Sequence, residues 1–136
     1  MKDAVRQTAP SFAGINPDHQ KRYFFAANHV EIGMRVLDAA CGIGYGGQLL
    51  WQAWGDVDAA DISMDAIATA RCFYPGPRYC RLDLENIATA KLNYDLVVSL
   101  ETIEHLKHPE RFLSKVRGKL IASVPNEERY PFDAAI

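Results

Sequence analysis

The residues best suited to binding chemistry lie in a glycine-rich segment at residues 36–47, which reads VLDAACGIGYGG. An apolar pair ends in the carboxylate of Asp38, and the glycines then lead into an apolar helical pattern. This order predicts a strand, a tight turn and a helix. Gly42, Gly44 and Gly46 leave room for a flat ligand against the backbone, and the first turn of a helix offers free N–H groups. The segment therefore predicts a ligand-binding loop.

The class of ligand depends on Asp38, because Gly42, Gly44 and Gly47 also satisfy the dinucleotide pattern G-x-G-x-x-G. In a dinucleotide site the pyrophosphate lies at the helix N-terminus, where a preceding carboxylate would repel it. A ligand with a cationic end near Asp38 fits better. S-adenosylmethionine carries both an ammonium and a sulfonium, so the sequence favours this cofactor over NAD.

Four motifs together resemble those of the class I S-adenosylmethionine-dependent methyltransferases. They are the glycine-rich segment, an acid at Asp61, the segment LDLEN that contains Asp83, and the segment YDLVVSLETIEHLKHPE at residues 94–110. The resemblance covers roughly residues 20 to 126. It is nearest to small-molecule O-methyltransferases, including those of quinone biosynthesis, and to short methyltransferases of bacterial and phage genomes. It implies S-adenosylmethionine as the methyl donor and S-adenosylhomocysteine as the product.

The composition fits one compact domain. The 136 residues are 49% hydrophobic, which suits one core but hardly two. A formal charge of -2 gives no basic footprint for nucleic acid, so we expect a small-molecule acceptor. The apolar runs fall short of the roughly 18 residues that cross a bilayer, and the first residues form no apolar signal segment. We therefore expect a cytoplasmic protein with no membrane partner.

The apolar periodicity predicts alternating strands and helices behind a flexible N-terminal arm or lid at residues 1–16. Helices are expected at 17–28, 44–54, 63–73, 102–106 and 109–116, a short irregular helix at 85–90, and strands at 34–38, 56–61, 78–82, 94–100 and 119–124. Strands separated by helices pair in parallel through right-handed crossovers. The sequence thus predicts an α/β fold with a Rossmann-like, doubly wound, mostly parallel five-stranded sheet. Helices cover both faces of this sheet, in a single donor-binding domain at residues 17–136.

The fifth predicted strand, at residues 119–124, is an expected weak point of this sheet. Methyltransferases of this class continue into two further hairpin strands, which the sequence lacks. Its apolar edge would then carry unpaired backbone groups. We therefore expect either that the chain is a fragment or that another chain covers this edge, and a homodimer is the expected partner.

Acids at strand ends are the expected contacts of the donor, because ligands of doubly wound sheets bind outside the carboxyl ends of the strands. Asp61 follows the glycines at about the 20-residue spacing of an acid that binds ribose hydroxyls. Ser63 is the better cap for the next helix, which leaves Asp61 free. The resemblance implies that Ile62 packs on the adenine face, that Asp83 accepts from the adenine amine and that Leu84 adds a backbone contact. Asp83 alternatively forms only a turn.

Arg22 and Tyr23 resemble a pair that similar proteins place over the methionine end of the donor, where a guanidinium can bind the carboxylate. The alternative is a solvated Arg22 and a core Tyr23. The full set of expected donor-binding residues is Arg22, Tyr23, Asp38, Ala40, Gly42, Gly44, Asp61, Ile62, Asp83, Leu84 and Leu100.

The expected catalytic residues lie in the segment ETIEHL at residues 101–106. Methyl transfer from a sulfonium mainly needs an aligned acceptor and a group that accepts a proton. His105 is the expected general base, because an imidazole with a pKa of about 6.5 can take a hydroxyl proton at neutral pH. Glu101 is the second expected catalytic residue. The alternative is that His105 only caps or packs the short helix.

A metal site is a second possible use of the same segment. Glu101, Glu104 and His105 would share a helical face and offer two oxygens and one nitrogen to a divalent ion. This resembles the metal-dependent methyltransferases that modify the 2′-hydroxyl at small-RNA ends. Those enzymes use a further histidine downstream, and no histidine follows Asn126, so no metal is expected.

Two further functions are compatible with the glycine-rich segment. One is a donor-binding module that needs a partner chain for its substrate pocket, because acceptor pockets of this class often use the C-terminal part that the sequence lacks. The second is an NAD-dependent oxidoreductase, against which Asp38 argues.

Overall fold

The computed structural model describes residues 16–87 and 92–125 of the chain. The predicted arm at residues 1–16, apart from Asn16, and the turn residue Asn126 lie outside these ranges. The strands are β1 (Arg35–Ala39), β2 (Asp56–Asp61), β3 (Arg78–Arg81), β4 (Leu96–Leu100) and β5 (Lys119–Ser123). The helices are α1 (Pro17–Ala27), α2 (Tyr45–Gln52), α3 (Met64–Phe73) and α4 (Pro109–Leu113), with 3-10 turns η3 (Leu84–Asn86) and η4 (Ile103–His105).

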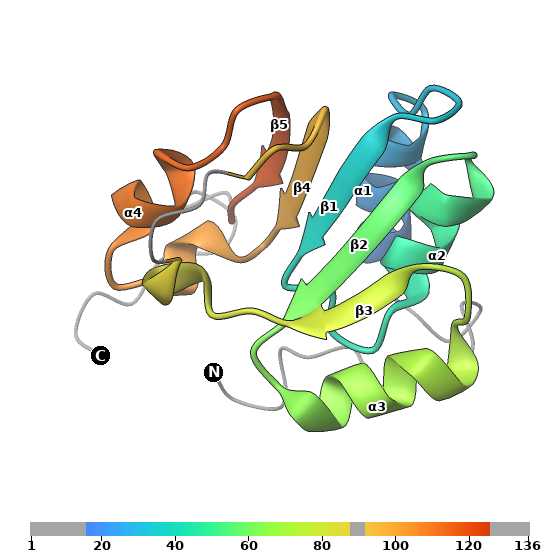
Figure 1. Ribbon diagram of the computed structural model, residues 1–136, viewed down its shortest axis with the longest axis horizontal. Coiled ribbons are helices and arrows are strands. Elements are labelled where there is room, and N and C mark those ends of the chain that lie inside the picture. The colour runs from blue at the N-terminus through green and yellow to red at the C-terminus, as the bar shows by residue number, and fades with distance from the viewer. Residues whose placement is uncertain (1–15, 88–91, 126–136) are drawn as a thin grey trace.

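The five strands form one sheet in the order β3-β2-β1-β4-β5, and every neighbouring pair is parallel (Figure 1). The chain first moves outward from β1 to β3 and then returns to the other side of β1. Strand order therefore reverses between β1 and β4, which is where doubly wound sheets bind ligands. The predicted fold class is confirmed.

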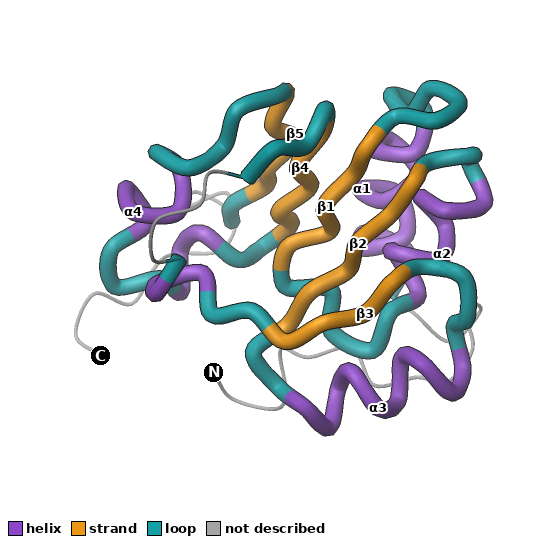
Figure 2. Tube along the Cα trace, viewed as in Figure 1, coloured by secondary structure: helices purple, strands orange, loops and turns teal. Residues whose placement is uncertain are grey.

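Alternating side chains of the strands feed two separate cores. Val36 and Val98 pack with residues of α1, α2 and α3. Leu37 and Val97 point to the opposite face and pack with Leu84 of η3 and with α4. Helices therefore cover both faces of the sheet, as Figure 2 shows in purple around the orange strands.

Local sequence signals explain where the helices begin. The side chain of Asn16 accepts a hydrogen bond from the Asp18 amide at 2.8 Å, and Pro17 follows it as the first helical residue of α1. Ser63 caps α3 by accepting from the Ala66 amide at 3.2 Å, as predicted. These caps position α1, whose Tyr23 contacts Asp38 of β1, and α3, which follows Asp61 of β2.

The two predicted helices after β4 are shorter than expected, whereas the predicted helix at 85–90 lies partly outside the described residues. The segment at 102–106 forms only the 3-10 turn η4, and α4 ends at Leu113 instead of residue 116. Val116 forms an isolated parallel bridge with Leu92, so the chain is already extended there. Within the described ranges, no helix combines the length and apolarity needed to span a membrane.

Candidate functional site

The candidate site lies where the carboxyl ends of β1, β2 and β4 meet. After β1 the chain turns at Ala40, a non-glycine residue with a φ of 62°, and the Cys41 amide donates to the Ala60 carbonyl of β2 at 2.8 Å. The next amide, that of Gly42, donates to the Asp61 carboxylate at 2.9 Å. The glycine loop is thereby bound to the end of the neighbouring strand.

Asp61 is held by two backbone amides. One oxygen accepts from Gly42 and the other from Ser63, each at 2.9 Å. Ser63 caps the helix as expected, and Asp61 makes two backbone contacts of its own. A carboxylate has about four acceptor positions, so two remain for other donors. The ribose role of Asp61 stays a prediction.

The three glycines of the loop are required for different structural reasons. Gly42 has a φ of +56°, and a Cβ there would meet nothing within 4 Å, so this position borders open space. A Cβ on Gly44 would lie 2.7 Å from Tyr79, and one on Gly46 would lie 2.1 Å from the ring of Tyr23. The expectation that ligand contact explains all three glycines is corrected, because Gly44 and Gly46 are required by packing.

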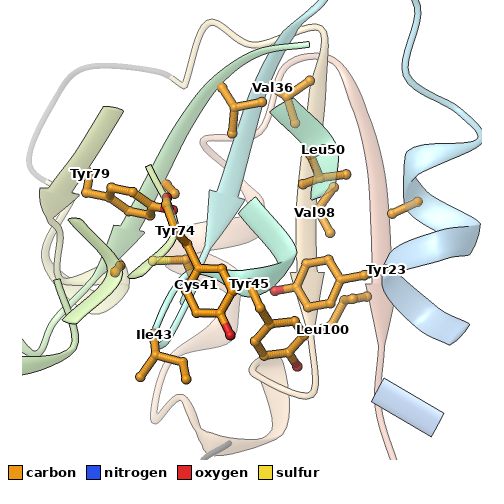
Figure 3. Packing of buried hydrophobic residues seen from close by; sticks show 14 of the residues in the cluster. Tyr23, Val36, Cys41, Ile43, Tyr45, Leu50, Tyr74, Tyr79, Val98 and Leu100 are labelled. Atoms are coloured by element: carbon orange, nitrogen blue, oxygen red, sulfur yellow. Dashed lines mark hydrogen bonds between the residues drawn. The ribbon is translucent and has the colours of Figure 1, made fainter. Parts of the chain in front are cut away.

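Asp38 lies in the core between α1 and α2 and is fully buried. The hydroxyl of Tyr23 donates to its two oxygens at 3.0 and 3.3 Å, and Figure 3 shows Tyr23 among the buried aromatic residues. Burial raises the pKa of Asp38 to about 8, against the lowering effect of the Tyr23 hydrogen bond and with a smaller raising effect of Asp61. Direct contact between Asp38 and a cationic ligand was expected, but its side chain does not reach the surface.

Arg22 binds a carboxylate of the protein itself. Its guanidinium lies 3.1 Å from Oε1 of Glu101 and joins α1 to the chain after β4. Glu101 has a φ of 51°, and its amide donates to the Ser123 carbonyl at 3.0 Å. Backbone strain of this kind clusters at functional sites. Tyr23, the other member of the predicted pair, is a core residue that holds Asp38.

His105 pairs with Glu104 rather than with Glu101. Its Nε2 lies 3.5 Å from Glu104 Oε1, and its side chain is 36% exposed against 10% for Glu104. Burial, and next the proximity of Glu101, raise the pKa of Glu104 against the opposing effects of a backbone hydrogen bond and of His105. Because Glu101 precedes the 3-10 turn, the predicted helical face does not form. In the described part of the chain, no three His, Cys, Asp or Glu side chains gather as a metal site.

The expected adenine-side residues lie after β2 and β3. Ile62 is 52% exposed, as a residue that packs on a ligand would be. Asp83 accepts from the Glu85 amide at 3.0 Å and so forms the alternative turn at the start of η3. Leu84 and Leu100 are buried at 6% and 7% exposure and belong to the two cores.

His19 is a site residue that sequence reasoning missed. Its Nδ1 is hydrogen-bonded to the hydroxyl of Tyr45, at the first turn of α2, and its ring centroid lies 6.2 Å from that of Tyr23. Burial, and next the Arg22 charge, lower the pKa of His19, while Glu101 opposes them. The available signal was the spacing of His19 and Tyr23, which are four residues apart and share a face of α1.

A doubly wound parallel sheet with a glycine loop at its switch point defines the class of Rossmann-like nucleotide-binding and cofactor-binding proteins. The family model of a methyltransferase domain matches residues 37–122. The chain therefore belongs to this methyltransferase family, and the resemblance stated from the sequence is confirmed.

Individual relatives agree with this assignment. A probable S-adenosylmethionine-dependent methyltransferase of Mycobacterium tuberculosis is 33% identical over 97 residues, which are 67% of this chain and 35% of the relative. A ubiquinone biosynthesis O-methyltransferase of Cereibacter sphaeroides is 28% identical over 114 residues, or 76% of this chain and 46% of the relative. The chain thus spans less than half the length of these relatives.

Solved structures share the fold. The magnesium protoporphyrin IX methyltransferase of Synechocystis, determined with bound SAH, superposes with a TM-score of 0.65 at 24% identity. The matched region covers 85% of this chain and 61% of that protein.

Proposed function

We propose that the protein transfers a methyl group from S-adenosylmethionine to a small-molecule acceptor. The observation that carries the proposal is the Gly42–Asp61 hydrogen bond, which joins the glycine loop at the switch point to the acid at the end of the neighbouring strand β2. Family membership and the names of the relatives support the choice of donor. The partial coverage of those relatives leaves the acceptor to experiment.

The residues around the loop fit such a donor. Gly42 borders open space, Asp61 retains acceptor positions for ribose hydroxyls, and exposed Ile62 offers an apolar surface to adenine. Arg22 would bind the donor carboxylate after leaving Glu101. When bound, the donor supplies an electrophilic methyl group next to a good leaving group.

The chain itself must accept the proton of the acceptor. The lone pair of the acceptor forms the new bond to the methyl carbon while the carbon–sulfur bond breaks and its electrons remain on sulfur. The acceptor's proton then passes to His105, which is exposed and paired with Glu104. Glu101 is close enough to Arg22 and Ser123 to orient this part of the site.

Transfer of label from a methyl-labelled donor into small-molecule extract tests the proposal. Native mass spectrometry of the purified protein should also show bound S-adenosylmethionine or S-adenosylhomocysteine. Bound NAD in their place would refute both the enzyme and the donor-binding module. Donor binding without any label transfer would instead favour the module that needs a partner chain.

His105→Gln should lower turnover by about 100-fold with little change in donor affinity, in line with loss of a general base. His108→Gln is the matched control, because His108 is a neighbouring exposed histidine. An equal loss of donor affinity and turnover in the His105 variant would make that residue structural.

We also propose a cytoplasmic homodimer that pairs near β5. The strand is the outer one of the described sheet on that side, and Leu120 and Val124 are 38% and 56% exposed. An exposed apolar edge favours association. Light scattering that gives a monomer mass at micromolar concentration would contradict the dimer.

A further inference from the structure

An open groove lies at the opposite end of the sheet from the glycine loop. It has a volume of about 460 Å³ and is formed where β1, β4 and β5 begin. In Figure 1 this is the end from which the arrows of these three strands start. Arg35, Arg117 and Lys119 line the groove together with the acid Asp95.

The backbone holds the groove in a fixed shape. The Arg35 amide donates to the Asp95 carboxylate at 2.8 Å, and the Asp95 amide donates to the Arg35 carbonyl at 2.8 Å. The Lys119 amide donates to the Asp95 carbonyl at 3.0 Å. A Cβ on Gly118 would lie 2.2 Å from the Tyr94 carbonyl, so only glycine allows these two segments to approach so closely.

The cations of the groove differ in how firmly they are held. The guanidinium of Arg35 lies 5.2 Å from the centroid of the Tyr94 ring and 3.5 Å from Asp58. The Tyr94 hydroxyl donates to the same Asp58 carboxylate at 2.7 Å, which fixes the ring. Arg117 and Lys119 are exposed to solvent. Three cations, Arg35, Arg117 and Lys119, line the groove against the one carboxylate of Asp95, so the lining carries a net positive charge although the chain is formally at -2.

We propose that this groove binds an acidic segment of a partner protein. Charge complementarity carries the choice: spaced carboxylates of an extended segment would pair with Arg117 and Lys119 and lie beside the Arg35–Tyr94 stack. A nucleic-acid backbone fits less well, because its continuous row of phosphates would also pass Asp56 and Asp58 beside Arg35, whereas carboxylates spaced along a peptide can meet Arg117 and Lys119 and avoid these acids. The inference does not depend on methyl transfer, since the groove lies away from the glycine loop.

The test is a titration of the full chain with a fluorescein-labelled hexaglutamate peptide, followed by anisotropy at low and physiological salt. We expect saturable binding that weakens as salt rises. The variant Arg117→Gln/Lys119→Gln should bind about tenfold more weakly, since it loses two charge contacts. Lys21→Gln/Lys107→Gln is the control, because it removes two exposed cations elsewhere and so has the same net charge as the groove variant.

Three results would overturn the proposal. They are the absence of saturable binding at low salt, an equal loss of binding in both double variants, and tighter binding of inorganic pyrophosphate than of the peptide in the same groove. Melting temperatures equal to that of the unsubstituted chain would show that all variants are folded. Amide shifts of Asp95 and Lys119 in NMR spectra on peptide addition would place the ligand in the groove and support the proposal.

Discussion

The two ends of the sheet use the same residue type in opposite ways. At the carboxyl end of β2, Asp61 accepts hydrogen bonds from the backbone amides of Gly42 and Ser63. At the amino-terminal half of the same strand, Asp58 is paired with Arg35 and Arg78 and accepts from Tyr94. Backbone amides carry no net charge, whereas guanidinium groups neutralise an acid. The negative charge of Asp61 is therefore held by neutral backbone amides, whereas that of Asp58 is neutralised by cationic side chains.

The difference has a topological cause. Parallel strands bring loop amides and the first turns of the following helices to their carboxyl ends, which are polar but uncharged positions. At the other end the chain enters the strands, and long charged side chains such as that of Arg78 extend into solvent. In β2, the expected ligand contact thus lies at the carboxyl end, whereas the acids that form ion pairs lie in the amino-terminal half.

The largest expected effect concerns the packing of the glycine loop. Gly46→Ala would place a Cβ 2.1 Å from the buried ring of Tyr23, and such overpacking costs about 1–3 kcal/mol of unfolding free energy. Gly42→Ala is the control, because it meets open space and adds only backbone strain of about 1 kcal/mol. Chemical denaturation measures both changes. Equal losses of unfolding free energy in the two variants would contradict the different packing of Gly42 and Gly46.

The buried acid Asp38 behind the loop gives a pH-dependent effect, which within one pH unit is smaller than that of Gly46→Ala. The pKa of Asp38 is raised from 3.8 to about 8, so the folded protein keeps this proton between these values while the unfolded chain loses it. Stability from this group is therefore lost as pH rises through that window, by on the order of 1 kcal/mol per pH unit.

The matching variant is Asp38→Asn, which keeps the shape of the side chain without titrating. Between pH 5 and 9 the melting temperature of the unsubstituted chain should fall relative to that of the variant. If the melting temperatures of the two proteins changed with pH in parallel, Asp38 would be charged throughout this range. The contrast between the buried Asp38 and the ion-paired acids would then be contradicted.

The smallest expected effect on stability comes from the ion pairs of Arg78 at the amino-terminal end of the sheet. The side chain of Arg78 is 61% exposed and lies 2.7 Å from Asp56 and 2.6 Å from Asp58. Exposed ion pairs contribute about 1 kcal/mol or less, so Arg78→Gln should change stability slightly, and less at high salt. Donor affinity should not change. A clear loss of donor affinity in calorimetry would show that the two ends are coupled.

Much of this fold was predictable because the central strands β1 and β4 contain apolar runs and the other strands follow at regular spacing between helical segments. Parallel pairing followed from the alternation of strands and helices. The order β3-β2-β1-β4-β5 did not, since it depends on which neighbour each strand finds in space. The predicted helix at 102–106 failed because a segment of this length forms only the single 3-10 turn η4 after the left-handed Glu101.

The sequence indicated where the candidate site lies but not the contacts of its residues, whose ligand-binding roles stay predictions. Asp61 was found by its spacing from the glycines, but the two amides that hold it come from separate segments of the chain. The burial of Asp38 depends on Tyr23 and α1, which pack over β1 from a part of the sequence before it. His19 was missed because its partner Tyr45 lies on another helix. Contacts between distant segments are thus the information that local patterns lack.

The most direct test compares the same substitution at two positions of β2, one at its carboxyl end and one in its amino-terminal half. Asp61→Asn and Asp58→Asn are titrated with S-adenosylhomocysteine in a calorimeter, alongside the unsubstituted chain. We predict that Asp61→Asn loses about 1.5–3 kcal/mol of binding free energy, the contribution of a hydrogen bond to a charged group, while Asp58→Asn binds as the unsubstituted chain does. Unchanged affinity in Asp61→Asn, or an equal loss in both variants, would contradict the assignment of the donor site to the carboxyl end of the sheet.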